Sequence, residues 1–384
     1  MHWPFCEAKC PYCDFNSHVV ASVDHLRWAR ALVADLTRQA QDSPDRILGS
    51  IFFGGGTPSR MQPETVAAVI DAARALWPSA NDLEITLEAN PTSVEADRFR
   101  GFADAGVNRV SMGFQALRDD DLRRLGRTHD VAQALAAWEV ARTHFPRASF
   151  DVIYARQHQG FDAWKTELAE IAALGPEHLS LYQLTIEPGT VFGRRAEAGR
   201  LDGLPDGERS ADMYLFTNDF LASQGYAQYE TSNHARAAGR CCHNLTYWRA
   251  GDWLGIGPGA HGRFGLGAAR RATVAHRMPQ RWLDAVETDG QGTEICTTGD
   301  ATGHAEEYLL TATRLAEGID LSRLSRLGLM LDPPTDLIAD GLLRHDAGRL
   351  IPTAHGLALA DRLAVELVQR SNPVPVSRSQ SESS

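Results

Sequence analysis

The chain has 384 residues, 43% hydrophobic and 23% charged, and 49 acidic against 38 basic residues give a net charge of -11. No stretch approaches the roughly 20 uninterrupted apolar residues of a membrane-spanning helix, and the acidic balance disfavours nucleic acid as a partner. The N-terminus lacks a charged segment followed by an apolar one, so we expect no secretion signal and a cytoplasmic protein.

Between residue 24 and about residue 231, helix-like stretches alternate with short apolar runs. This alternation is typical of βα units around a parallel sheet. The predicted helices are 24–40, 63–77, 94–105, 131–143 and 161–174. The predicted strands are 50–53, 83–89, 108–112, 149–154 and 178–184. We therefore expect an α/β protein with a closed or partly closed barrel, whose working loops follow the C-terminal ends of the strands.

Unusual residues follow several predicted strands. The glycine run 54–56 comes directly after strand 50–53, Glu88 lies near the end of the next strand, and Gln115 follows strand 108–112. These residues should meet on one rim of the barrel. A cysteine cluster that begins at Cys6 would share this rim if a strand preceded it, but only five residues do. We therefore expect a truncated first strand, with residues missing before Met1.

The pattern changes beyond residue 231. Residues 232–296 form a connecting region rich in glycine, histidine and aromatic residues, and 297–371 read as a small, mainly helical module. Within that module, helices are predicted at 306–316, 321–327, 334–339 and 357–369, with a short hairpin before the last one. Residues 372–384 have the composition of a disordered tail.

The six cysteines are unevenly placed, and Cys6, Cys10 and Cys13 lie within eight residues. In a reducing compartment such a cluster indicates a metal site rather than disulfides. Three thiolates suit a 4Fe-4S cluster with one iron left open. Structural zinc would need a fourth ligand, for which His2 and His18 are the nearest residues. The spacing favours the iron–sulfur cluster.

The CxxxCxxC spacing, with Tyr12 before the last cysteine, resembles the signature of the radical S-adenosylmethionine (SAM) superfamily. Further motifs are similar to the branch that contains oxygen-independent coproporphyrinogen oxidases and HemW-type haem chaperones: IFFGGGTPS, EITLEANP, GVNRVSMGFQ, LGRTHD, DVIY, LSLYQLTIEPGT, HNLTYW and GIGPGAHG. This resemblance implies a partial (β/α)6-type radical SAM barrel over 1–231 and a C-terminal, mainly helical winged-helix-like domain.

The same resemblance implies the cofactors and their ligands. Cys6, Cys10 and Cys13 would hold a 4Fe-4S cluster, and SAM would bind its open iron. The residues at the positions of the family's SAM contacts are Tyr12, Gly55, Gly56, Thr57, Glu88, Gln115, Arg127 and Asp151. The glycines would let the backbone approach the ligand, and the polar side chains would bind its charged groups and hydroxyls. Taken one at a time, each could instead be an ordinary rim residue.

Three features depart from the family pattern. The tyrosine expected six residues before the first cysteine would fall before Met1. The family's Gly-Leu-Pro-Gly-Gln after Tyr154 is replaced by Ala155-Arg-Gln-His-Gln159, which puts the shape of that loop in question. Phe15 stands where the coproporphyrinogen oxidases carry a fourth cysteine, and this difference favours the chaperones.

The segment 243–248 matches the HNxxYW motif that is associated with haem in HemW-type proteins. His243 is thus a candidate axial haem ligand, with Tyr247 and Trp248 against the porphyrin faces. Without the resemblance, a histidine beside two aromatic residues is more often structural. Cys241 and Cys242 are expected to be packing residues, with secondary haem contacts as the alternative. His261 in GIGPGAHG is a weak candidate for an adenosyl contact.

Two functions therefore stay open. The first is a haem chaperone that binds a 4Fe-4S cluster, SAM and haem, and transfers haem to an acceptor such as a respiratory haem protein. The alternative is an oxygen-independent coproporphyrinogen III oxidase, which would be an enzyme. A zinc-stabilised barrel without redox chemistry is the third reading.

Overall fold

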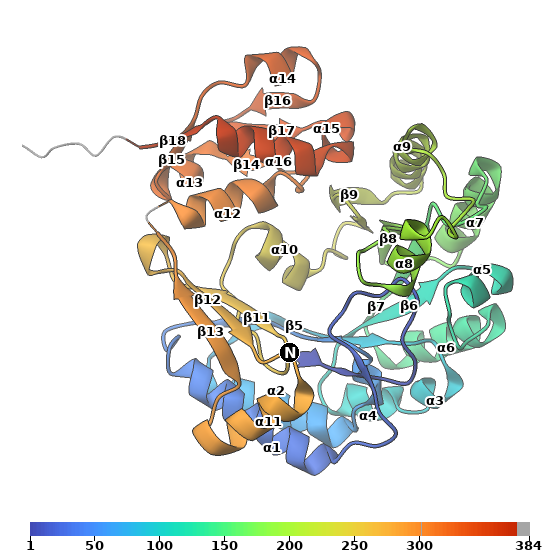
Figure 1. Ribbon diagram of the computed structural model, residues 1–384, viewed down its shortest axis with the longest axis vertical. Coiled ribbons are helices and arrows are strands. Elements are labelled where there is room, and N and C mark those ends of the chain that lie inside the picture. Colours follow the sequence, from blue (N-terminus) through green and yellow to red (C-terminus); the bar gives the residue numbers. More distant parts are fainter. Residues whose placement is uncertain (301, 375–384) are drawn as a thin grey trace, which may run out of the picture.

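The computed structural model describes residues 1–300 and 302–374. Its main sheet within those residues has eight strands in the order β1-β4-β5-β6-β7-β8-β10-β9, and the sheet is strongly curved (Figure 1). Neighbouring strands are parallel from β1 to β8, whereas β10 is antiparallel to β8 and to β9. The strands are β1 His2–Trp3, β4 Leu48–Gly55, β5 Ser79–Ala89, β6 Arg109–Gln115, β7 Arg147–Tyr154, β8 His178–Gln183, β9 Ala227–Glu230 and β10 Asn233–Ala235. The α/β fold predicted from the sequence is confirmed.

Helices cover the outside of this sheet (Figure 1). They are α1 His25–Ala40, α2 Pro63–Leu76, α3 Ser93–Ala96, α4 Phe99–Asp104, α5 Asp119–Arg124, α6 Val131–His144, α7 Phe161–Ala173 and α9 Gly207–Ser223. The short helix α8 Val191–Glu197 lies instead beside the loop that carries Cys10 and Cys13, where the Phe192 N–H donates to the Pro11 carbonyl at 2.9 Å. The single helix predicted at 94–105 is in fact two, α3 and α4. Side chains alternate along each strand. On β5, Ile85 and Leu87 belong to the hydrophobic core, while Glu88 lines the central cavity.

The N-terminal segment completes the sheet. Strand β1 pairs in parallel with β4, with His2 opposite Gly54 and Trp3 opposite Gly55. A second short pair, β2 Phe5–Cys6 and β3 His18–Val19, closes the loop that carries the cysteines. The first strand is therefore present, although it is only two residues long.

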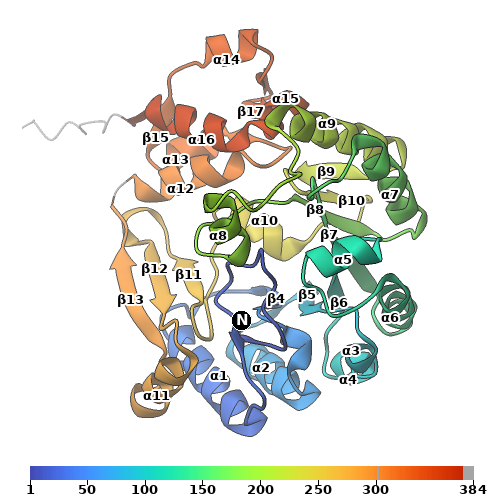
Figure 2. The same ribbon diagram turned by 45° about the vertical axis from the view of Figure 1, so that its right-hand side comes forward.

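Residues 242–298 connect the barrel to the C-terminal unit. They contain the short helix α10 Cys242–Trp248, the antiparallel sheet of β11 His261–Phe264, β12 Arg271–Ala275 and β13 Thr293–Thr298, the 3-10 turn η2 Gly267–Ala269, and α11 Pro279–Asp289. Helix α11 packs on α1. Helix α10 lies between the barrel and the C-terminal unit in both ribbon views (Figure 2).

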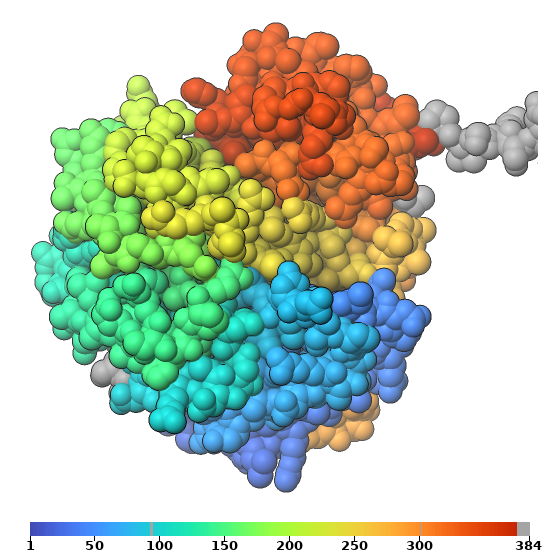
Figure 3. Space-filling view, turned by 180° about the vertical axis from the view of Figure 1, so that it is seen from behind, coloured from blue at the N-terminus to red at the C-terminus, as the bar shows by residue number. Residues whose placement is uncertain are grey.

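The C-terminal unit has its own hydrophobic core. Its elements are α12 Gly303–Ala312, β14 Ile319–Asp320, α13 Leu321–Arg326, β15 Leu329–Leu331, α14 Thr335–Ala339, β16 Leu343–Asp346, β17 Arg349–Pro352, α15 Ala354–Ala358, α16 Ala360–Gln369 and β18 Ser371–Pro373. Seen from behind, this orange-to-red unit sits on the yellow connecting region (Figure 3). The tail predicted at 372–384 begins too early, because Asn372 and Pro373 pair with β15. Residues 375–384 lie outside the described part of the chain.

Candidate functional site

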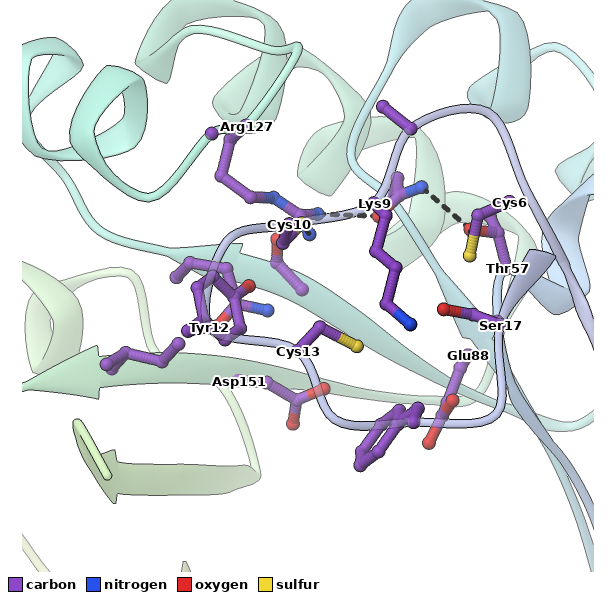
Figure 4. Close-up of a pocket in the computed structure, with 18 of the residues that line it drawn as sticks. Cys6, Lys9, Cys10, Tyr12, Cys13, Ser17, Thr57, Glu88, Arg127 and Asp151 are labelled. Atoms are coloured by element: carbon purple, nitrogen blue, oxygen red, sulfur yellow. Dashed lines mark hydrogen bonds between the residues drawn. The ribbon is translucent and has the colours of Figure 1, made fainter. Parts of the chain in front are cut away.

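The cysteine loop lies over a cavity of about 510 Å³ inside the barrel. Cys6 belongs to β2, and Cys10 and Cys13 follow in the loop that leads to β3. Figure 4 shows the three cysteines around one hollow, with Glu88 and Asp151 at its other side. All eleven cluster and SAM residues expected from the sequence line this cavity: the three cysteines with Tyr12, Gly55, Gly56, Thr57, Glu88, Gln115, Arg127 and Asp151.

The donor set fits an iron–sulfur cluster better than a single metal ion. Within the described residues, no three histidine, cysteine or acidic side chains are close enough together to hold one ion. A four-iron cluster gives each thiolate its own iron, so it needs thiolates that surround a larger core. Three thiols on one loop that faces an open cavity meet that requirement.

Two hydrogen bonds reach the thiol sulfurs. The Thr57 hydroxyl donates to Cys6 Sγ at 3.5 Å, and Arg127 Nη1 donates to Cys10 Sγ at 3.5 Å. Burial raises the pKa of Cys6 and of Cys13, so both thiols favour the protonated form while no cation is bound. Iron would displace these protons, and the two donors would then stabilise thiolate charge.

Two carboxyl groups face the cavity from neighbouring regions of the sheet. Glu88 Oε2 accepts the Gly55 backbone N–H at 3.2 Å, and both oxygens of Asp151 accept from the Ser111 hydroxyl at 3.0 and 3.1 Å. Burial, and next the charge of Asp151, raise the pKa of Glu88 to about 8. Burial also raises the pKa of Asp151. A ligand that brings an ammonium group or hydroxyl donors would relieve this repulsion.

Arg127 is held rigidly between the cysteine loop and the ends of the strands. Besides Cys10, its guanidinium donates to Asn90 Oδ1 at 2.5 Å and to the Gly113 carbonyl at 3.2 Å. Its Nε is buried and has no hydrogen-bond partner among the described residues. A fixed cation beside the cluster cysteines is suited to binding a carboxylate.

Gln115 has a strained backbone with φ of 67° at a register shift between β6 and β7. Such left-handed conformations cost a non-glycine residue about 1–2 kcal/mol and cluster at functional sites. The strain turns Gln115 toward the cavity that it lines.

Gly55 and Gly56 have a packing role that the sequence did not predict. A Cβ on Gly55 would lie 2.8 Å from the Trp3 carbonyl oxygen, and one on Gly56 would lie 2.8 Å from the Phe5 carbonyl oxygen and 3.0 Å from Cys6 Sγ. The glycines therefore make room for the N-terminal segment that carries Cys6. The sequence predicts a close approach of these glycines to a ligand, and the structure shows an additional close approach to the backbone of Trp3 and Phe5.

The HNLTYW motif forms helix α10, and His243 lies outside the lining of the main cavity. The His243 ring stacks on Phe52 of β4, with centroids 4.2 Å apart and planes at 13°, and it meets the Tyr247 ring edge-on at 4.6 Å. Burial lowers the pKa of His243 well below its usual value, so the imidazole is neutral, as an iron ligand must be. Trp248 packs on the core of the C-terminal unit instead of beside His243, with the Arg314 guanidinium over its ring at 4.8 Å.

The GIGPGAHG motif packs on the N-terminal segment. The Ile256 carbonyl accepts the His2 N–H at 2.7 Å, and the Pro258 carbonyl accepts from Asn16 Nδ2 at 3.1 Å. His261 is exposed and lies outside the lining of the cavity.

Comparisons with known proteins agree with this geometry. Residues 1–165 match the family model of the radical SAM superfamily. The chain is 38% identical over 382 residues to mouse "Radical S-adenosyl methionine domain-containing protein 1, mitochondrial", covering 96% of this chain and 86% of the relative. It is 38% identical to the "Heme chaperone HemW" of Escherichia coli, covering 93% of this chain and 94% of the relative, and 42% identical to that of Haemophilus influenzae over 68% of this chain and 69% of the relative.

The chain belongs to the HemW family of the radical SAM superfamily.

A solved structure shares the whole fold. The E. coli coproporphyrinogen III oxidase HemN, described as a radical SAM enzyme, aligns with a TM-score of 0.78 and 21% sequence identity, covering 95% of this chain and 88% of that one. This confirms the partial radical SAM barrel with a helical C-terminal domain. Within the described residues, no helix has both the length and the apolar character needed to cross a membrane.

In the loop after Tyr154, two residues that are not glycine have left-handed backbone conformations. Ala155 and His158 stand at the two positions where the family pattern has glycine, and their φ angles are 55° and 61°. The loop is held by the His158 N–H, which donates to the Gly203 carbonyl at 2.6 Å, and by buried Arg156, which pairs with Glu167 at 2.5 Å. The loop therefore has left-handed residues at both positions, although neither residue is glycine.

Among the cavity residues that were not singled out in the sequence are Lys9, Ser111 and Tyr182. Ser111 lies on the same face of β6 as Arg109, and its hydroxyl bridges Asp151 and Ser149. Small polar residues at alternate positions of otherwise apolar strands were a signal that could have identified Ser111. Lys9 and Tyr182 carried no such signal.

Proposed function

We propose that this protein is a haem chaperone that binds a 4Fe-4S cluster, SAM and haem, and transfers haem to an acceptor protein such as a respiratory haem protein. One observation carries the proposal: three cysteines and eight residues at SAM-contact positions surround a single cavity. The similarity to relatives named HemW supports the chaperone role.

In this proposal the chain holds both cofactors by direct contacts. Cys6, Cys10 and Cys13 hold the cluster and leave one iron for SAM. Glu88 and Asp151 bind the amino group and ribose hydroxyls of SAM, and Arg127 binds its carboxylate. Tyr12, which lines the same cavity, packs beside the adenine. A bound cluster supplies one-electron chemistry toward SAM, and the barrel excludes water from it.

Haem would bind at α10, through the neutral imidazole of His243. Glu84 fixes this helix, because its carboxylate accepts the backbone N–H groups of Cys242 and His243, each at 3.2 Å. Helix α10 lies next to the SAM cavity, because His243 stacks on Phe52 and the glycine run 54–56 follows Phe52 closely in the chain.

The cluster is tested by anaerobic reconstitution. Wild-type protein should take up iron and sulfide and show broad visible absorption, and Cys10→Ser should lose both. Cys296→Ser is the matched control, because Cys296 is exposed and remote in sequence from the loop. Normal iron and sulfide in a variant that lacks all three loop cysteines would contradict the assignment.

The haem site is tested by titration with haem. We expect a stoichiometric Soret change that His243→Ala weakens and that His144→Ala, on the outer helix α6, leaves unchanged. Cluster content and SAM binding in each variant report whether the fold is intact. An unaltered titration in His243→Ala would remove this residue as the ligand.

The alternative activity is tested in the same preparation. Coproporphyrinogen III, SAM and reductant are added, and the porphyrin products are followed. The chaperone proposal expects no turnover, consistent with Phe15 in place of a fourth cysteine. Rapid decarboxylation would instead identify a coproporphyrinogen III oxidase.

A further inference from the structure

A second, smaller cavity lies behind the cysteine loop. It has a volume of about 220 Å³ and is lined by Trp3, Phe5, His25, Arg60 and Arg98 among others. Phe5 and Cys6 are consecutive in β2, so their side chains point to opposite faces of the strand. Cys6 accordingly lines the large cavity and Phe5 the small one. The small cavity opens beside Ala21 and Ser22, which are exposed.

The polar groups around this cavity are mainly hydrogen-bond donors that lack acceptors. Arg60 Nη1 and Trp3 Nε1 are both buried, and neither has a hydrogen-bond partner among the described residues. Trp3 itself is 0% exposed. A buried donor without an acceptor costs about 1–3 kcal/mol, and an acceptor bound in this cavity would remove that cost.

The positive charges are also uncompensated. Within residues 1–300 and 302–374, neither Arg60 nor Arg98 forms an ion pair with a carboxylate, and Arg98 Nη1 makes only a long hydrogen bond of 3.4 Å to the Arg60 carbonyl. The acidic side chains near His25 are Asp24 and Glu64, and both are exposed. Asp24 is occupied in capping α1, where its carboxylate accepts the Arg27 N–H at 3.0 Å.

The aromatic residues give this donor set a rigid wall. The His25 ring stacks on Trp3, with centroids 5.8 Å apart and planes at 12°, and Trp3 also meets Phe5 edge-on at 5.2 Å. The Trp3 indole is therefore fixed in place before a ligand arrives. Two arginines and a tryptophan that line one small cavity supply N–H donors of the kind that bind the oxygens of an anion.

We propose that this cavity binds a small oxyanion of the phosphate or carboxylate class. The bound oxyanion accepts from Arg60, Arg98 and Trp3, and it places negative charge on the side of β2 opposite the cluster. This site does not depend on the proposed haem or SAM chemistry, because it shares no lining residue with the main cavity.

The test is calorimetric titration of the reconstituted protein with inorganic phosphate in one arm and acetate in another, with ionic strength held constant by chloride. We expect saturable binding of one anion per chain. Arg60→Gln and Arg98→Gln should each weaken it by at least about tenfold. Arg30→Gln is the matched control, because Arg30 is an exposed arginine of the nearby helix α1, and it should bind like wild type.

The two arms identify the class of oxyanion. Tighter binding of phosphate assigns the site to phosphate-bearing ligands, and tighter binding of acetate assigns it to carboxylates. Absence of saturable binding in both arms, or equal binding by wild type and both variants, would overturn the proposal. If Arg60→Gln fails to fold, Arg98→Gln still tests the proposal, because Arg98 is only half-buried. A bound anion should also raise the melting temperature of the wild type, and Arg98→Gln must abolish that rise.

Discussion

The His243 backbone N–H donates to Oε1 of Glu84 at 3.2 Å, and this hydrogen bond joins the HNLTYW helix to strand β5 of the barrel. Glu84 is 2% exposed and also pairs with Arg147 Nη1 at 2.7 Å. A carboxylate at the N-terminus of α10 satisfies backbone donors that the helix cannot satisfy itself. The orientation of His243 thus depends on a residue 159 positions earlier in the chain.

Glu84→Gln should loosen this helix. We expect the free energy of unfolding to fall by about 2 kcal/mol, since charge-assisted hydrogen bonds are replaced by weaker ones, and haem to bind more weakly. Urea denaturation and haem titration measure the two effects. Glu177→Gln is the control, because Glu177 also pairs with Arg147, at 2.7 Å, but does not hold α10. Equal haem binding in the two variants would contradict a positioning role for Glu84.

Glu88 should make the stability of the ligand-free protein depend on pH. Burial and Asp151 raise the pKa of Glu88 from 4.5 to about 8 in the fold, so the folded protein holds this proton more tightly than the unfolded chain. The resulting stabilisation is fully present below pH 4.5 and is lost as the pH rises toward 8.

We expect the Glu88 contribution to the free energy of unfolding to fall by at most about 1.4 kcal/mol per pH unit in that window. Glu88→Gln should flatten this slope in urea denaturation, while the exposed Glu64→Gln should not. An identical pH profile for Glu88→Gln and wild type would show that Glu88 is ionised in the ligand-free fold.

Thr57→Val should change the redox properties of the bound cluster. The lost hydroxyl no longer donates to Cys6 Sγ, and hydrogen bonds to sulfur favour the reduced, more negative cluster. The midpoint potential should therefore become more negative, as followed by spectroelectrochemical titration. Thr65→Val is a suitable comparison, because this buried hydroxyl lies in α2 and donates to the His25 carbonyl at 3.4 Å. A potential that moves equally in both variants would argue against the Thr57 contact.

Replacing the two left-handed residues after Tyr154 by glycine should have unequal effects. His158→Gly should stabilise the protein by about 0.5 kcal/mol, because glycine adopts a φ of 61° without strain and His158 is exposed. Ala155→Gly should be nearly neutral, since Ala155 is 4% exposed and the relief of strain is offset by about 0.8 kcal/mol for the buried methyl group. Thermal and urea unfolding provide the comparison. Greater stabilisation by Ala155→Gly would show that the methyl group is poorly packed.

Much of the barrel was predictable because its signals are local. The strand at 149–154 and the helix at 131–143 are recognisable from apolar runs and from Asp130, which begins α6 with a capping box. The rule that working loops follow strand ends then predicts that Glu88, Gln115 and the cysteines lie on one rim. Their roles as ligands came from the resemblance, since the polar residues alone would fit an ordinary surface.

The remaining features depend on contacts between distant segments. No periodicity indicates that Gly56 must clear the Phe5 carbonyl, or that Trp248 packs on the C-terminal core while His243 stacks on Phe52. The donors of Arg60 and Trp3 meet only because β1 and the turn after β4 lie side by side. Such pairings are set by tertiary packing, which a single sequence does not encode in any local pattern.

Strand β5 carries Glu88 at the main cavity and Glu84 at the HNLTYW helix, four residues apart on one face. Extended chain advances about 3.3 Å per residue, so the backbone positions of the two carboxylates are separated by roughly 13 Å. Because hydrogen bonds to β4 and β6 flank this strand, it has no hinge between them. Two ligands bound beside these carboxylates would keep fixed positions relative to each other, and any exchange between them would have to come from movement of the ligands.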